Sequence, residues 1–270
     1  MNNTVTRTIS GIFFLAIVIG GFLIDKYLYA ALLVFMMMTM LYEFYRMTMG
    51  DRFPRTRLLA IVLGCCSYLT LFSVMAFRLD IRLISVNAVL LLLLMISTLF
   101  VKDKADFKLF AFLYTGLLYI AAPLTLSNFV VFDAAGQFNG QPMLAFFIII
   151  WASDVGAYCV GMLLGKYTGK LFPTVSPKKT WAGFWGGLLF AVLAGLILVW
   201  TGLWTYPWYH AVILSLIMHV AGVFGDLFES QWKRVCEIKD SGNIIPGHGG
   251  MLDRFDSALF AIPAGVIYLV

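Results

Sequence analysis

Residues 181–203 read WAGFWGGLLFAVLAGLILVWTGL, a run without a charged side chain. About 20 apolar residues suffice for a helix to cross a bilayer. Mean hydropathy of +0.92 and 61% hydrophobic residues exclude a soluble globular domain. We therefore predict an all-α fold, a polytopic helical membrane protein with about nine transmembrane helices. The predicted spans are 10–25, 27–46, 57–78, 83–101, 108–129, 142–164, 181–203, 208–229 and 255–270.

Lysine and arginine are distributed unequally between the two sides of these helices. With a cytoplasmic N-terminus, all but three of the 19 Lys and Arg residues (Lys26, Arg78 and Arg82) lie on the cytoplasmic side. The positive-inside rule favours this orientation, in an integral protein of the cell inner (cytoplasmic) membrane. The cations suit anionic membrane lipids. They form no continuous basic face, which excludes nucleic acid as a partner.

Chemically informative residues are concentrated in the second half of the chain. We expect residues 1–140 to be a lipid-facing scaffold of membrane helices. Residues 141–270 are predicted to be catalytic membrane helices with cytoplasmic motif loops at 165–180 and 229–254. Glu43 is a carboxylate in the first half, and we predict an interfacial ion pair with Arg46.

Asp154 lies inside the predicted span 142–164, where a lone carboxylate costs several kcal/mol. It should face a polar cavity, pair with a cation or be protonated; an interhelical hydrogen bond is the structural alternative. Whether Asp154 is a metal ligand or orients a lysine stays open. Gly161 and Gly165 allow close helix packing, within one chain or in a homodimer.

The segment Ser176–Thr180 reads SPKKT and precedes the span 181–203. Ser176 is predicted as a helix N-cap and Pro177 as part of the first helical turn. Free helix N–H groups, the two lysines and the two hydroxyls would together form a phosphate cradle. A basic helix start at the inner face is also common for topological reasons, so this motif alone does not establish a site.

Carboxylates gather at the ends of the last two predicted helices. His219, Gly222, Asp226 and Glu229 share one helical face by spacing. Asp253 and Asp256 lie one helical turn apart. Magnesium takes oxygen ligands, usually one or two carboxylates with waters and phosphates. Asp226, Asp253 and Asp256 are therefore predicted metal ligands, with helix capping as the alternative for the last two.

Between these helices, residues 230–256 read SQWKRVCEIKDSGNIIPGHGGMLDRFD. The glycines around His248 would expose backbone N–H groups to phosphate oxygens. We interpret His248 as a phosphate contact; an acid/base group and an ordinary loop histidine are the alternatives.

The segment 230–256 closely resembles the signature of the phosphatidate cytidylyltransferases, also called CDP-diacylglycerol synthases. The matching elements are Ser230, Lys233-Arg234, Lys239-Asp240, Pro246-Gly-His248-Gly-Gly250 and Asp253-Arg254-Phe-Asp256. Trp232 departs from the aliphatic residue or Phe that is usual there, which affects local packing only. The resemblance extends to Ser176–Thr180 and to Asp154–Tyr158.

This resemblance implies that CTP and phosphatidic acid react to give CDP-diacylglycerol and pyrophosphate at the cytoplasmic membrane face. It also implies Mg²⁺ and a second cation such as K⁺. The implied catalytic residues are Asp154, Asp226, Lys239, Asp253, Arg254 and Asp256. The implied substrate-binding residues are Ser176, Lys178, Lys179, Thr180, Lys233, Arg234, His248, Gly249 and Gly250.

Two other functions are consistent with the same residues. A CTP-dependent kinase of a polyprenol or phytol would transfer the γ-phosphate and release CDP. A secondary transporter would use Asp154, His219 and Asp226 as an ion relay. Against a transporter, the chain shows no repeated halves, and its charges gather at one membrane edge.

Overall fold

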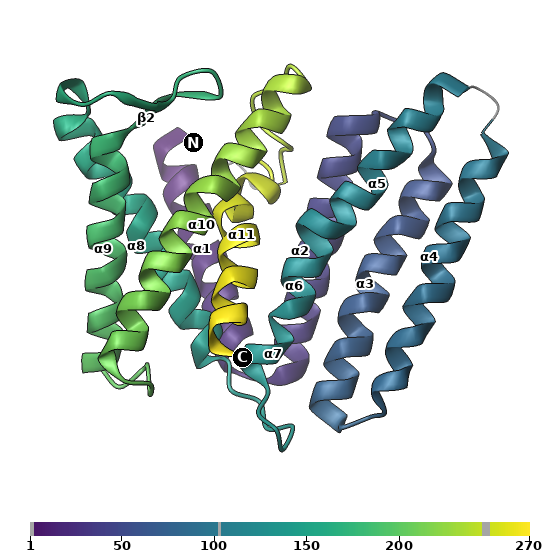
Figure 1. Ribbon diagram of the computed structural model, residues 1–270, viewed down its shortest axis with the longest axis horizontal. Helices are drawn as coiled ribbons and strands as arrows, with labels where there is room; N and C mark the ends of the chain where they lie inside the picture. Colours follow the sequence, from purple (N-terminus) through teal and green to yellow (C-terminus); the bar gives the residue numbers. More distant parts are fainter. Residues whose placement is uncertain (1–2, 102–103, 245–248) are drawn as a thin grey trace. The chain divides into compact units, whose positions relative to one another are not determined.

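The computed structural model describes residues 3–101, 104–244 and 249–270, and most of them are helical (Figure 1). This confirms the predicted all-α membrane class. The long helices are α1 (Asn3–Leu23), α2 (Lys26–Met49), α3 (Pro54–Phe77), α4 (Ser85–Ser97), α8 (Gln141–Leu164), α9 (Trp181–Trp200), α10 (Trp208–Val235) and α11 (Leu252–Leu269). The short elements are η1 (Ile81–Ile84), η2 (Thr98–Phe100), η3 (Lys104–Leu109), α5 (Phe110–Gly116), η4 (Leu117–Ala121), α6 (Ala122–Leu126), α7 (Asn128–Val131), η5 (Gly165–Tyr167), β1 (Lys170–Phe172) and β2 (Ser176–Thr180).

Seven helical segments of the described chain are long and apolar enough to cross a membrane. They are Lys26–Met49, Pro54–Phe77, Ile81–Phe100, Asp106–Val131, Gln141–Tyr167, Trp181–Trp200 and Trp208–Val235. Each coincides with a predicted span. The first and last predicted spans are also helical, as α1 and α11. Their membrane crossing, and so the total of nine, stays a prediction.

The chain forms two compact units. The first contains residues 1–139 and 238–254, and the second contains residues 140–237 and 255–270. In the first unit, α2 packs against α3 and against the helical segment that contains α5 and η4. The buried Tyr45 lies against Gly116, where any side chain would collide with its ring, and its hydroxyl donates to the Leu113 carbonyl at 2.9 Å. A glycine is needed at this crossing because the two helices approach so closely.

In the second unit, α8 and α9 pack closely through small residues. A Cβ on Gly161 would lie 3.5 Å from the Cα of Gly183, and one on Gly187 would lie 2.9 Å from the Ser153 carbonyl. Glycines let the two helix backbones approach closely. Such close packing is expected in a membrane, where the hydrophobic effect does not drive helices together. The glycine pairs of the sequence therefore serve packing inside one chain.

The antiparallel hairpin β1–β2 connects α8 to α9 and corrects one prediction about the SPKKT segment. Ser176 pairs with Phe172, and Thr180 pairs with Lys170. The predicted N-cap at Ser176 and helical turn at Pro177 are wrong, because this segment is extended and pairs with β1. The N-cap of α9 is Thr180, whose Oγ1 accepts the Gly183 N–H at 3.2 Å.

Candidate active site

Four carboxylates of the second unit lie within electrostatic reach of one another. Asp256 interacts with Asp154, Asp226 and Glu229. Asp154 in turn interacts with Asp226 and with Lys179. We call Asp154, Asp226, Glu229 and Asp256 the acidic cluster. These side chains come from α8, α10 and α11, so three helices contribute to the cluster.

Gly225 lets α11 approach α10 beside the acidic cluster. Any side chain at Gly225 would collide with the main-chain carbonyl of Asp256, and its Cβ would lie 3.2 Å from the Cβ of Phe260. The neighbouring Gly222 faces Ser257 in the same way, at 3.5 Å. The glycines of α10 therefore bring the Asp256 segment next to Asp226.

Lys179 from strand β2 is the cation that pairs with Asp226. Its Nζ lies 2.6 Å from the Asp226 Oδ2, and both side chains are partly buried. The hydroxyl of Ser230 donates to the other oxygen of Asp226 at 3.3 Å. Successive residues of a strand point to opposite sides, and the adjacent Lys178 is accordingly exposed. The two lysines of SPKKT are therefore not equivalent.

The hairpin contacts α10 at two further points. The Phe172 ring lies edge-on to Phe224 with centroids 6.5 Å apart. The Nε of Arg234 donates to the Val175 carbonyl at 3.4 Å. These contacts, together with the Lys179–Asp226 ion pair, hold the hairpin against the C-terminal half of α10.

The predicted helical face of α10 extends in both directions from Asp226. Glu229 is fully buried, and its Oε2 lies 2.5 Å from Lys233 Nζ, one turn further along. His219 is also buried, and its Nδ1 lies 2.8 Å from the Ser153 hydroxyl of α8. His219 thus makes an interhelical hydrogen bond, the ordinary structural role of a buried polar residue.

Asp253 belongs to the first unit and accepts hydrogen bonds from the loop before α11, whose described residues 238–244 and 249–251 we call the signature loop. Its Oδ2 accepts hydrogen bonds from the N–H and hydroxyl of Ser241, at 2.9 and 3.0 Å, and from the Gly250 N–H at 2.9 Å. These bonds tie the loop to the first turn of α11, in which Asp253 lies. The predicted role of Asp253 as a metal ligand stays a prediction.

Glu43 also binds this loop, and its predicted ion pair with Arg46 is wrong. The carboxylate of Glu43 is buried and accepts the N–H groups of Met251 at 3.0 Å and Leu252 at 2.8 Å. Arg46, one helical turn away, is exposed. A carboxylate inside a membrane span is costly unless it has partners. This argument, which we apply to Asp154, also identifies Glu43 as a residue that needs partners.

The remaining predicted site residues differ in their exposure to solvent. Lys239 and Arg254 are exposed, and Ser176 is partly exposed. Gly249 has a φ of +85°, which side chains rarely adopt. Thr180 is buried, and its predicted contact with substrate stays a prediction. His248 lies outside the described residues.

The acidic cluster has the donor chemistry for magnesium but does not form a complete ligand set. In the part of the chain that the structure describes, no three His, Cys, Asp or Glu side chains are placed to hold a metal ion together. Magnesium often needs one or two carboxylates, the rest being waters and substrate phosphates. Asp226 and Asp256, brought together at Gly225, fit that requirement.

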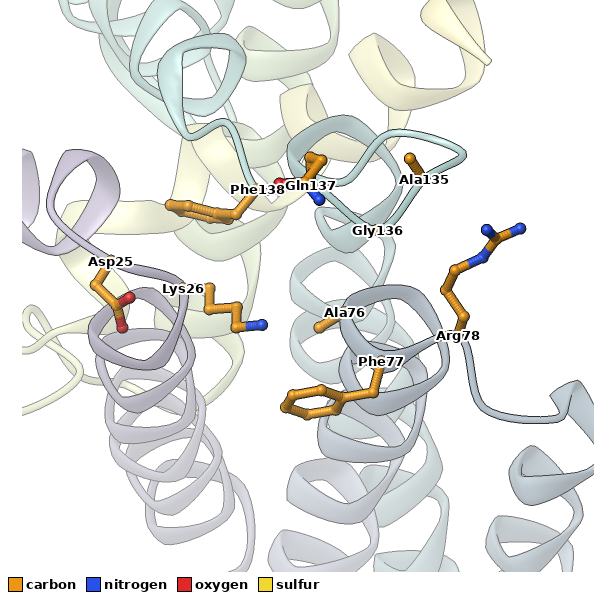
Figure 2. Close-up of a pocket in the computed structure, with 9 residues that line it drawn as sticks. All are labelled: Asp25, Lys26, Ala76, Phe77, Arg78, Ala135, Gly136, Gln137 and Phe138. Atoms are coloured by element: carbon orange, nitrogen blue, oxygen red, sulfur yellow. The ribbon is translucent and has the colours of Figure 1, made fainter.

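A separate pocket in the first unit contains none of the predicted site residues (Figure 2). It is lined by Asp25, Lys26, Ala76, Phe77, Arg78, Ala135, Gly136, Gln137 and Phe138. Lys26 Nζ lies 4.6 Å from the centroid of the Phe77 ring. Lys26 starts α2, whereas Glu43 lies near its other end, roughly 25 Å away along the helix. This pocket therefore lies far from the signature loop.

Comparison with known proteins agrees with the signature. The model of the cytidylyltransferase family matches residues 5–270. A protein of Bacillus subtilis (strain 168) named phosphatidate cytidylyltransferase is 39% identical over 172 residues, 64% of this chain and 62% of that protein. Proteins of the same name from Staphylococcus haemolyticus (strain JCSC1435) and Staphylococcus saprophyticus subsp. saprophyticus are 35% identical over 178 residues and 43% identical over 124 residues. These matches cover 66% and 46% of this chain, and 66% and 47% of the two relatives.

The matched stretches span less than two thirds of the length of these relatives. The family model, in contrast, covers almost the whole chain, including the hairpin, the acidic cluster and the signature loop. The chain belongs to the cytidylyltransferase family.

Proposed function

We propose that this protein is a phosphatidate cytidylyltransferase that converts CTP and phosphatidic acid into CDP-diacylglycerol and pyrophosphate. An oxygen of the phosphatidate phosphate attacks the α-phosphorus of CTP, the bond to the β-phosphate oxygen breaks, and pyrophosphate leaves. Support comes from the family, from the names of the relatives and from the signature. The phosphatidate oxygen is already anionic at neutral pH, so the reaction needs positioning and charge neutralisation more than a general base.

The observation that carries the proposal is the ion pair between Lys179 and Asp226 at the edge of the acidic cluster. Lys179 lies on a short hairpin and can exchange its carboxylate partner for a substrate phosphate. Lys233 and Arg234, at the end of α10, add positive charge in the same unit. A polyanionic substrate would thus be bound by lysines and arginine next to a site for its metal.

We assign Mg²⁺ to Asp226 and Asp256, and retain K⁺ as a proposed second cation. When bound, Mg²⁺ neutralises phosphate charge and stabilises the leaving oxygen. Asp154 helps to orient Lys179 in this account, because its carboxylate lies within electrostatic reach of the Lys179 ammonium group. Asp253 holds the signature loop through Ser241 and Gly250. Lys239 and Arg254 are proposed to contact phosphate groups from that loop.

We further propose nine membrane crossings, a cytoplasmic N-terminus and an inner-membrane location, with the site facing the cytoplasm. The support is the distribution of lysine and arginine over the loops. CTP would arrive from the cytoplasm and phosphatidic acid from the inner leaflet. A homodimer has no support from the glycine pairs, which are used between α8 and α9.

The proposal is tested with purified protein in detergent, phosphatidic acid and CTP labelled in turn at the α-phosphate, the γ-phosphate and the cytosine ring. We expect α-phosphate and cytosine label in the lipid, with one pyrophosphate released per turnover. Transfer of γ-label alone would identify a kinase and overturn the proposal. Absence of transfer to lipid would also overturn it.

A further inference from the structure

Glu43 is a buried carboxylate inside a candidate membrane span, and its hydrogen bonds come from main-chain and hydroxyl groups of the loop before α11. Its side chain belongs to α2, yet Met251 and Leu252, which bind it, lie more than 200 residues later in the chain. Burying a carboxylate is costly unless hydrogen bonds compensate. The two N–H groups at the start of α11 provide that compensation, and their carboxylate partner suits the positive end of the helix dipole.

Ser241 connects Glu43 to Asp253. The Ser241 hydroxyl lies 3.0 Å from the Asp253 Oδ2 and 3.4 Å from the Glu43 Oε2. One hydroxyl proton serves one acceptor at a time, so the shorter contact to Asp253 dominates. The hydrogen bonds from the Met251 and Leu252 N–H groups are therefore the main contacts by which Glu43 positions the loop.

Close packing around Glu43 requires glycine at two positions of the loop. A Cβ on Gly242 would lie 2.8 Å from the Glu43 Cδ, whereas one on Gly250 would collide first with the Ser241 hydroxyl and would also lie 2.8 Å from the Glu43 Oε2. Such distances are not tolerated by real side chains without movement. Gly242 is therefore required by Glu43 itself, and Gly250 mainly by the close approach of Ser241 and Gly242 within the loop.

We infer that Glu43 is a positioning residue for nucleotidyl transfer, holding the first turn of α11 and the signature loop in the arrangement that presents Asp253 and Arg254. This inference rests on the proposed function. Glu43 touches neither substrate nor metal in this account; it acts through Met251, Leu252 and Ser241. Its loss would leave the start of α11 without its acceptor and free the loop to shift.

The test compares Glu43→Gln with wild type and with Tyr29→Phe as a matched control. Tyr29 lies on the same helix, and its buried hydroxyl donates to Ser127 at 2.7 Å, at the other end of α2 from the loop. The substitution Tyr29→Phe thus removes one buried hydrogen bond of α2 without touching the loop. The readouts are kcat, KM for each substrate, the thermal unfolding midpoint and hydrogen–deuterium exchange of the peptide covering 249–254.

For Glu43→Gln we expect kcat to fall at least tenfold and exchange at 251 and 252 to quicken, since one oxygen becomes an amide donor facing another donor. We expect Tyr29→Phe to retain wild-type kcat and exchange in that peptide. Wild-type kcat in folded Glu43→Gln, or lost activity with unchanged exchange, would overturn the inference. Inactive wild type would instead refute the proposed function.

Gly242→Ala keeps the test decisive if Glu43→Gln does not fold. Its added methyl group would collide with Glu43 and displace the loop while leaving both carboxylates intact. We expect the same fall in kcat and the same faster exchange. A folded Gly242→Ala variant with wild-type kcat would overturn the inference.

Discussion

Replacing Lys179 with alanine tests the predicted phosphate cradle most sharply, because the chain provides a control at the next residue. Lys179 Nζ lies 2.6 Å from Asp226 Oδ2, and the two side chains are 24% and 34% exposed. Lys178 carries the same charge one position earlier on β2, but its side chain is exposed. A pure net-charge effect would make the two substitutions equivalent, whereas the geometry makes them different.

The magnitude follows from the kind of contact that is lost. A hydrogen bond to a charged group contributes about 1.5–3 kcal/mol, and each 1.36 kcal/mol is tenfold in rate. Partial exposure weakens such pairs, so we take the lower half of that range, roughly 13- to 45-fold in kcat/KM. Without Lys179, the carboxylates of Asp226 and Asp154 also repel the phosphates of CTP, so the change should fall mainly on the KM for CTP.

The assay is the initial rate of cytidylyl transfer over a range of CTP concentrations at saturating phosphatidic acid. We expect Lys179→Ala to raise the KM for CTP, and Lys178→Ala to change kcat/KM by less than about threefold, as for an exposed charge. Equal effects of the two substitutions would refute the geometric reasoning. Wild-type constants for Lys179→Ala would refute the cradle itself.

Three further predictions concern Asp226, Thr180 and the metal. Asp226→Asn should reduce turnover about 1,000-fold or more with an unchanged circular dichroism spectrum; near-wild-type turnover would contradict the ligand assignment. Thr180→Ala should lower the free energy of unfolding by about 1 kcal/mol, because it removes the N-cap of α9, and should lower Tm by about 2–4 °C. Thr180→Ser should keep the cap, so equal Tm values for the two variants would contradict this role. Chelation with EDTA should abolish transfer and added Mg²⁺ should restore it, and transfer that persists in EDTA would exclude the proposed metal.

The membrane helices could be predicted because apolar length is a local property of the sequence. The run beginning at Trp181 is a helix from that residue, as predicted. The predicted span that contains α10 ends at residue 229, because hydropathy falls where Lys233 and Arg234 begin. The helix continues to Val235, and Lys233 is paired with Glu229 one turn before it.

The hairpin and the role of Glu43 could not be predicted from local patterns. Strands of three and five residues are too short for the alternation of side chains to be recognised in the sequence. The sequence therefore predicts a helix N-cap at Ser176, whereas Thr180 provides it. Glu43 depends on a contact with residues 251 and 252, for which spacing gives no information. By contrast, Asp154 and Asp226 could be selected because carboxylates in apolar helices are costly, and Asp256 because it lies one helical turn after Asp253. The structure places Asp154, Asp226 and Asp256 within electrostatic reach of one another.

The most direct test of the account is the fate of the α-phosphate of CTP. With α-labelled CTP, phosphatidic acid and Mg²⁺, the account predicts that label enters the lipid in step with pyrophosphate release, and that Asp226→Asn prevents both. Label that stays in the aqueous phase while γ-phosphate enters the lipid would contradict it.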